Sequence, residues 1–152
     1  MSASEITATL TAMKSVLEAA APARVVTDVF LPFDVRPDAE LLAGVLTILF
    51  VGVPAYDYEH TLQFDGIDHI QTDNALIEIS VVGQIRVAEN ATGAQLATAE
   101  IALLTDIEKL ANAGISDSRL NNLRLISAKC SSQMEAPYGW IYTLFQTRAD
   151  GE

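Results

Sequence analysis

One stretch of the chain combines histidines with a dense run of carboxylates, the side chains that bind divalent metals and transfer protons. It contains His60 and His69 and five acids, Asp57, Glu59, Asp65, Asp68 and Asp73. A metal site needs converging ligands, such as two histidines one turn apart on a helix. These two histidines stand nine positions apart in a segment without a regular period. We therefore interpret the segment as a solvated acidic loop, and we assign no metal site and no catalytic residue to it.

Other reactive groups lack the neighbours that their chemistry requires. Cys130 is the single cysteine, which excludes an intramolecular disulfide and a four-cysteine zinc site. We expect it to be a small buried apolar side chain at the end of a strand. Ser80 has no Gly-x-Ser-x-Gly context, and the chain contains neither a Gly-x-Gly-x-x-Gly nor a Walker-type motif. We therefore expect no cofactor and no enzymatic activity.

Length and composition favour one soluble domain covering residues 1–152. The chain has 152 residues, half of them hydrophobic, which excludes an intrinsically disordered protein. No stretch is typical of a signal peptide. The longest apolar run, Val45 to Ala55, has about 11 residues, too few for the roughly 20 of a membrane-spanning helix. We expect no membrane partner.

The charge is negative and unevenly distributed. The net charge is -11, which argues against general binding to a phosphate backbone. Residues 28–78 hold ten acids and one base, Arg36, and so contribute -9 of that total. This cluster either keeps an apolar protein soluble or forms a surface that repels DNA or meets a basic partner.

Hydrophobic periodicity predicts seven main elements. Apolar stripes at helical spacing predict helices over 3–21 and 93–113, and β-rich runs predict strands over 24–31, 45–53, 75–87, 123–131 and 139–148. Residues 38–42 fit a helical turn or an extended lead-in. Residues 54–74 form a long acidic loop or a hairpin insertion around Phe64-Asp65-Gly66. Thr92 and Gln95 predict a capping box for the second helix, and Gly114 predicts its C-cap.

The order α-β-β-β-α-β-β predicts an α+β fold, a two-layer sandwich with two helices on one face of a mainly antiparallel sheet of about five strands. In the strand 75–87, Ile77, Ile79 and Val81 alternate with polar residues, so one face is buried and the other meets water. Gly83 on the apolar face marks a bulge or a close backbone approach. In the last strand, Trp140 and Tyr142 share the face away from Ile141. That second sheet face is covered by the 54–74 segment or is a subunit interface.

This combination resembles the tail terminator family of long-tailed bacteriophages, also called minor tail protein U-like proteins. The resemblance lies in the length, in a helix at Ser4–Ala21 that leads into a strand at Arg24–Leu31, and in the strand Ala75–Val87 followed by the helix Ala94–Ala113. A closing hairpin that ends in Trp140–Thr147 completes the pattern. Residues 54–74 match least.

The resemblance implies a structural protein of the virion tail, at its head-proximal end, that is made in the host cytoplasm. Such proteins form a hexameric ring on the tail tube protein, stop tube polymerisation and join the head–tail connector. DNA passes through the lumen without specific binding, and an acidic lumen suits that passage because like charges repel. The interface residues we predict are Trp140, Tyr142, Asp57, Glu59, Asp65 and Asp68.

Two alternatives remain open. In the first, the chain is a head–tail connector or a tail tube component of the same virion. A tube component would polymerise into long cylinders. Otherwise it is a small cytoplasmic enzyme or ligand-binding domain that uses the 54–74 segment. That reading predicts a deep pocket with His60 or His69 and carboxylates of shifted pKa.

Overall fold

The computed structural model describes residues 3–56, 60–64, 66–71, 75–115, 117–132 and 137–149. The fold is α+β. In chain order its elements are α1 (Ala3–Ala20), β1 (Val25–Thr27), α2 (Asp38–Ala43), β2 (Val45–Tyr56), β3 (His60–Phe64), β4 (Ile67–Gln71), β5 (Ala75–Arg86), α3 (Gly93–Glu108), η1 (Lys109–Ile115), η2 (Ser118–Leu120), β6 (Arg124–Cys130) and β7 (Tyr138–Ala149). No helix within the described ranges is long and apolar enough to cross a membrane.

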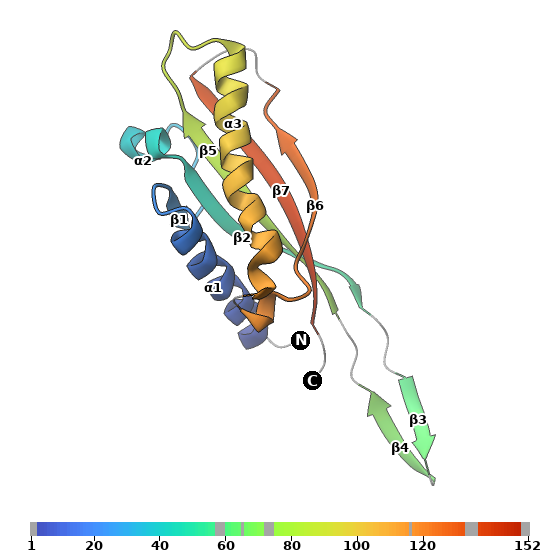
Figure 1. The fold of residues 1–152 in the computed structure, drawn as a ribbon. Coiled ribbons are helices and arrows are strands. Elements are labelled where there is room, and N and C mark those ends of the chain that lie inside the picture. Colours follow the sequence, from blue (N-terminus) through green and yellow to red (C-terminus); the bar gives the residue numbers. More distant parts are fainter. Residues whose placement is uncertain are drawn as a thin grey trace.

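The main sheet has five strands in the order β1-β2-β5-β7-β6. Only the β1–β2 pairing is parallel, and the other three pairings are antiparallel. Figure 1 shows α1 and α3 side by side on one face of this sheet. The predicted fold class, the order of the main elements and the placement of both helices on one face are therefore confirmed.

The core lies between the helices and the inward side of β5 and β7. Ile77, Ile79 and Val81 are buried against Met13 and Leu17 of α1, and against Leu103, Ile107, Ile141 and Phe145 from α3 and β7. Gly83 lies on the same side. A Cβ built at Gly83 would stand 2.8 Å from Ile141 Cγ2, so this glycine permits a close approach, one of the two roles predicted for it.

Helix α3 begins as predicted and ends earlier. Thr92 Oγ1 accepts from the Gln95 backbone N–H at 3.2 Å, and Gln95 Oε1 accepts from the Thr92 N–H at 2.8 Å, which forms the capping box. The α-helix stops at Glu108 and continues as the 3-10 helix η1. The predicted C-cap at Gly114 is wrong. Gly114 lies inside η1, where a Cβ would stand 2.7 Å from Asn121 Cα.

Two further predictions about strands need correction. The strand predicted over 24–31 is only Val25–Thr27, and the chain then leaves the sheet. Cys130 is exposed, because it lies at the end of the edge strand β6, which turns most of its residues to solvent.

Residues 60–71 form a second, two-stranded sheet. β3 and β4 pair antiparallel, from His60↔Gln71 to Phe64↔Ile67, with Gly66 at φ 76° in the turn. Figure 1 shows this hairpin beyond the ends of β2 and β5, away from both helices.

Candidate interaction surface

The sheet face opposite the helices is partly covered by residues 28–37, which we call the strap. The strap leaves β1 and reaches α2. Gln84 Nε2 donates to the Leu31 carbonyl at 3.1 Å, and the rings of Phe33 and Tyr138 lie 5.0 Å apart. Of the two alternatives for this face, coverage by the 54–74 segment is wrong for the described part of that segment, because the strap lies there and the hairpin lies beyond the end of the sheet.

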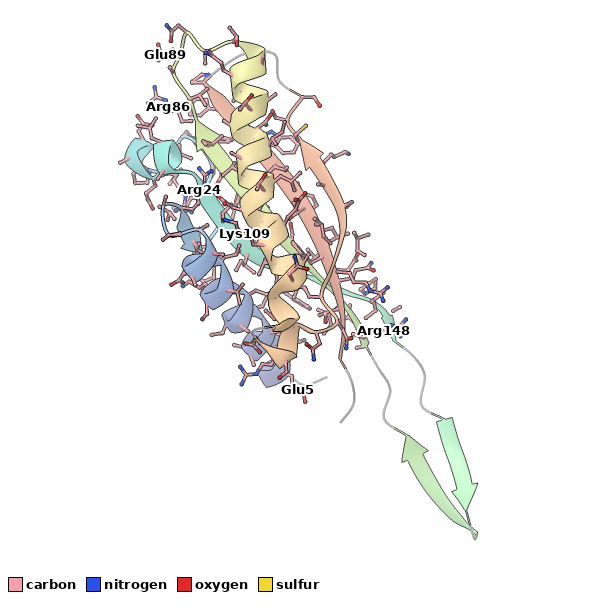
Figure 2. All side chains as sticks on the ribbon, viewed as in Figure 1. Glu5, Arg24, Arg86, Glu89, Lys109 and Arg148 are labelled. Atoms are coloured by element: carbon pink, nitrogen blue, oxygen red, sulfur yellow. The ribbon has the colours of Figure 1, made fainter. Side chains whose placement is uncertain are left out.

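Polar contacts hold the strap in place. Arg36 is 7% exposed, its Nη2 donates to the Val29 carbonyl at 2.7 Å, and its Nη1 lies 3.4 Å from Glu40 Oε1. Arg86 Nη1 pairs with Asp38 Oδ2 at 2.9 Å, and Figure 2 shows Arg86 at the α2 end of the sheet.

Some buried polar atoms of the strap and of strands β2 and β5 have no hydrogen-bond partner among the described residues. Within the described residues they are Arg36 Nε, Thr47 Oγ1, Gln84 Oε1 and Arg86 Nε. An unpaired buried polar atom costs about 1–3 kcal/mol, so such atoms are rare in folded proteins.

Ser80 and Gln84, on the face of β5 that the alternation predicts to meet water, are both about 1% exposed. Ser80 Oγ donates to the Thr143 carbonyl at 2.9 Å, so its burial is compensated by a hydrogen bond. The predicted wet face of β5 is therefore only partly wet.

Next to the strap lies a shallow apolar pocket of about 400 Å³. Its apolar lining comes from the strap, β5 and β7, and consists of Phe30, Pro32, Phe33, Val82, Trp140 and Tyr142. Phe30 is 45% and Tyr142 is 37% exposed. The structure thus brings together Trp140 and Tyr142, which the sequence predicted to share this face. Phe30 and Phe33 are not among the predicted interface residues, and Phe30 falls within residues 24–31, which the sequence predicted as a strand.

The acidic residues predicted for the interface, unlike Trp140 and Tyr142, are not described with their side chains. Asp57, Glu59 and Asp65 lie outside the described residues, and Asp68 lies in β4, where only the backbone is described. The hairpin follows the end of the sheet where Ala75 pairs with Ala149, whereas Trp140 pairs with Gln84 near the other end. The hairpin backbone that carries Asp68 and the position of Trp140 therefore lie toward opposite ends of the β5–β7 pair.

A titratable group with a shifted pKa lies on the helix side of the fold. Burial raises the pKa of Asp106, but hydrogen bonds from Arg24 Nε at 2.8 Å and Lys109 Nζ at 3.0 Å, with their charges, hold it below its ordinary value. Figure 2 shows Arg24 and Lys109 between α1 and α3. Arg24 Nη1 also donates to the Ala43 carbonyl at 3.0 Å. This cluster connects α3 to the start of the sheet and to the end of α1, because Lys109 Nζ also donates to the Ala20 carbonyl at 3.0 Å.

No group of three or more histidine, cysteine or carboxylate side chains that could hold a metal occurs among the described residues. His60 and His69 lie in β3 and β4, and their side chains are outside that description. A comparison with protein-family models finds no match for the chain, and a comparison with curated proteins finds none either.

Proposed function

We propose that this chain is a ring-forming assembly protein of the tail terminator type. In this proposal a ring of copies caps the completed tail tube, stops its polymerisation and offers the surface that joins the head. The protein acts at the head-proximal end of a phage tail and has no catalytic role. The support comes from the fold, from one exposed face and from the charge distribution.

The observation that carries the proposal is the aromatic surface on the sheet face away from the helices. Phe30, Tyr142 and the pocket that both line remain open to solvent, and the strap also exposes Val29 and Val35, at 56% and 58%. Contiguous exposed apolar surface of this kind marks protein–protein contact sites, where tyrosine and tryptophan are enriched.

The acidic segment 28–78 fits the same proposal. Copies that surround a DNA path need a surface that DNA does not adhere to, and like charge provides one. We place part of this segment at the lumen or rim of the ring. Neutralising Asp57, Glu59, Asp65 and Asp68 together should slow DNA delivery, and unchanged assembly and delivery would contradict this placement.

The decisive experiment measures mass in solution by light scattering over a range of concentrations, with and without purified tail tubes. We expect the 16.3 kDa chain to form a closed ring, of about 98 kDa if six chains associate, and to halt the growth of tube ends. Long cylinders would instead indicate a tube component. A chain that stays at 16.3 kDa and ignores tubes would refute the proposal and favour a ligand-binding domain.

Point variants test whether the aromatic surface is the contact. The double substitution Phe30→Ala and Tyr142→Ala should weaken capping by about tenfold or more, because buried aromatic anchors dominate interface energies. Ile101→Ala is the matched control, since Ile101 is 61% exposed on α3, on the other side of the sheet. Equal effects of the two changes would show that the aromatic surface is not the contact.

A further inference from the structure

The strand β6 forms one border of the main sheet, and no strand among the described residues pairs with its outer side. It spans seven residues, Arg124–Cys130, of which six are exposed, and Figure 1 shows it along the border of the sheet. The Ser131 N–H donates to the Trp140 carbonyl at 3.0 Å, toward β7. Because N–H groups alternate in direction along a strand, those of Ala128 and Cys130 point outward. An edge of this kind is a template for a further strand.

The two basic side chains of β6 carry positive charge that no ion pair within the described fold neutralises. Residues 118–134 contain three basic residues and no acid, although the whole chain contains 20 acids. Arg124 and Lys129 are exposed, and neither forms an ion pair with any described residue. Six other basic residues do form ion pairs with carboxylates, namely Lys14, Arg24, Arg36, Arg86, Lys109 and Arg119. The edge strand therefore presents positive charge on an acidic protein.

Both charges lie on the sheet face away from the helices. Arg124 is paired with Gln146, and Lys129 is paired with Tyr142. Residues directly opposite each other in an antiparallel pair share a face, and Gln146 and Tyr142 are on one face of β7 because an even number of positions separates them. A strand that adds to β6 would therefore meet Arg124 and Lys129 with side chains of one of its own faces, about four positions apart.

We propose that the outer edge of β6 binds an extended acidic strand of another protein. Strand addition supplies main-chain hydrogen bonds, and carboxylates opposite Arg124 and Lys129 supply the specificity. A second copy of this chain fits the edge poorly. Two β6 edges would bring like charges together, and the other border of the main sheet, β1, offers only three residues, none of them acidic. The inference is independent of the proposed function, because it concerns a contact that a single chain makes.

The test measures the binding of a fluorescently labelled peptide to the full chain by anisotropy. The peptide, Thr-Glu-Val-Thr-Val-Glu-Thr, has a high propensity for strands and places both glutamates on one face. A second peptide has lysines in place of the glutamates. We expect the acidic peptide to bind about tenfold or more tightly than the lysine peptide, and to lose affinity as the salt concentration rises.

Two double variants test the charges on β6. Arg124→Gln with Lys129→Gln should weaken binding of the acidic peptide by about tenfold or more. Both side chains are exposed, so the variant should keep the wild-type fold, which circular dichroism checks. Lys14→Gln with Arg119→Gln is the matched control, because it removes the same charge from α1 and η2 and should leave binding close to that of the wild type.

Methylated peptides test the strand pairing itself. In an added strand, the N–H groups of alternate residues point toward β6. Two acidic peptides, methylated on the odd or on the even backbone nitrogens, keep the same charge, but only one of them blocks the N–H groups that face β6. One peptide should therefore lose about tenfold or more in affinity, and the other should keep it. In amide hydrogen exchange, the unmethylated acidic peptide should protect residues 124–130.

Three results would overturn the proposal. Equal or absent binding of the acidic and lysine peptides would mean that the charges of β6 select no partner and only keep sheet edges apart. Equal binding of the two methylated peptides would exclude strand addition. A dimer of the chain alone in light scattering, strengthened by Arg124→Gln with Lys129→Gln, would make a second copy the occupant of the edge.

Discussion

Replacing Glu100 of α3 should destabilise the fold, because its buried carboxylate binds two neighbouring strands. Glu100 is 3% exposed, and its Oε2 accepts three hydrogen bonds: from Ser131 Oγ at 2.5 Å, from the Ser131 N–H at 3.2 Å and from the Trp140 N–H at 2.9 Å. One buried carboxylate thus fixes the end of β6 and the beginning of β7 to the helix.

The magnitude follows from what each donor retains in Glu100→Ala. The Ser131 N–H keeps a bond to the Trp140 carbonyl at 3.0 Å, so the change removes the Glu100 acceptor from the Trp140 N–H and from Ser131 Oγ. Hydrogen bonds to charged groups contribute about 1.5–3 kcal/mol each, and the burial cost of the carboxylate offsets part of this. We expect a loss of about 3 kcal/mol, which lowers the melting temperature by roughly 6–12 °C for a chain of this size.

Urea unfolding followed by the fluorescence of Trp140, the single tryptophan, measures this loss. Glu108→Ala, at an exposed position near the end of the same helix, is the control and should change the free energy of unfolding by less than about 0.5 kcal/mol. Glu100→Gln keeps the shape and should cost about half as much as Glu100→Ala. If Glu100→Ala behaves like Glu108→Ala, the carboxylate does not hold the two strands.

Three further predictions concern stability and access. Gly83→Ala should lower the free energy of unfolding by about 1–3 kcal/mol, because its Cβ would stand 2.8 Å from Ile141. The Cβ of Gly52→Ala meets nothing within 4 Å, so this control should be close to neutral. Equal urea midpoints for the two variants would contradict this reasoning. The pKa of Asp106 is lowered in the folded chain, so the unfolded chain takes up the proton first as pH falls. The stability advantage of the wild type over Asp106→Asn should therefore be full at neutral pH and decline below about pH 4. A difference in stability that does not change with pH would refute the ion pairing. The exposed Cys130 thiol should react fully with a thiol reagent in the native state, and a reaction that requires denaturant would show that the strand edge is covered.

Local patterns predicted most of the fold. The capping box at Thr92 and Gln95 and the alternation of Ile77, Ile79 and Val81 depend on residues a few positions apart, so one sequence suffices to find them. The strap depends on contacts that no local pattern contains, such as the bond between Gln84 and Leu31, which are 53 residues apart. Polar residues of a strand are buried when a distant segment satisfies them, and this is why the face around Gln84 was expected to be wet.

The sequence predicted the part of the candidate surface that depends on local alternation and missed the part that depends on distant contacts. Alternation in β7 placed Trp140 and Tyr142 together on the correct face. The position of Phe30 beside them depends on where the chain turns after β1, and neither composition nor periodicity specifies that turn. The pocket lined by Leu76, Arg124 and Arg148 brings together residues of β5, β6 and β7, so no single segment of the sequence predicts it.

The continuity of β2, β3, β4 and β5 has a consequence for folding kinetics. The pairings run from Phe64↔Ile67 at the turn to Val45↔Gln84 at the far end, and all belong to one stretch of chain. Each new pairing therefore closes a loop only slightly longer than the one before, which costs little entropy. The β5–β7 pairing, by contrast, joins residues more than 50 positions apart, such as Arg86 and Tyr138. We expect the β2–β5 ribbon to form before the rate-limiting step and the addition of β7 and β6 to set the folding rate.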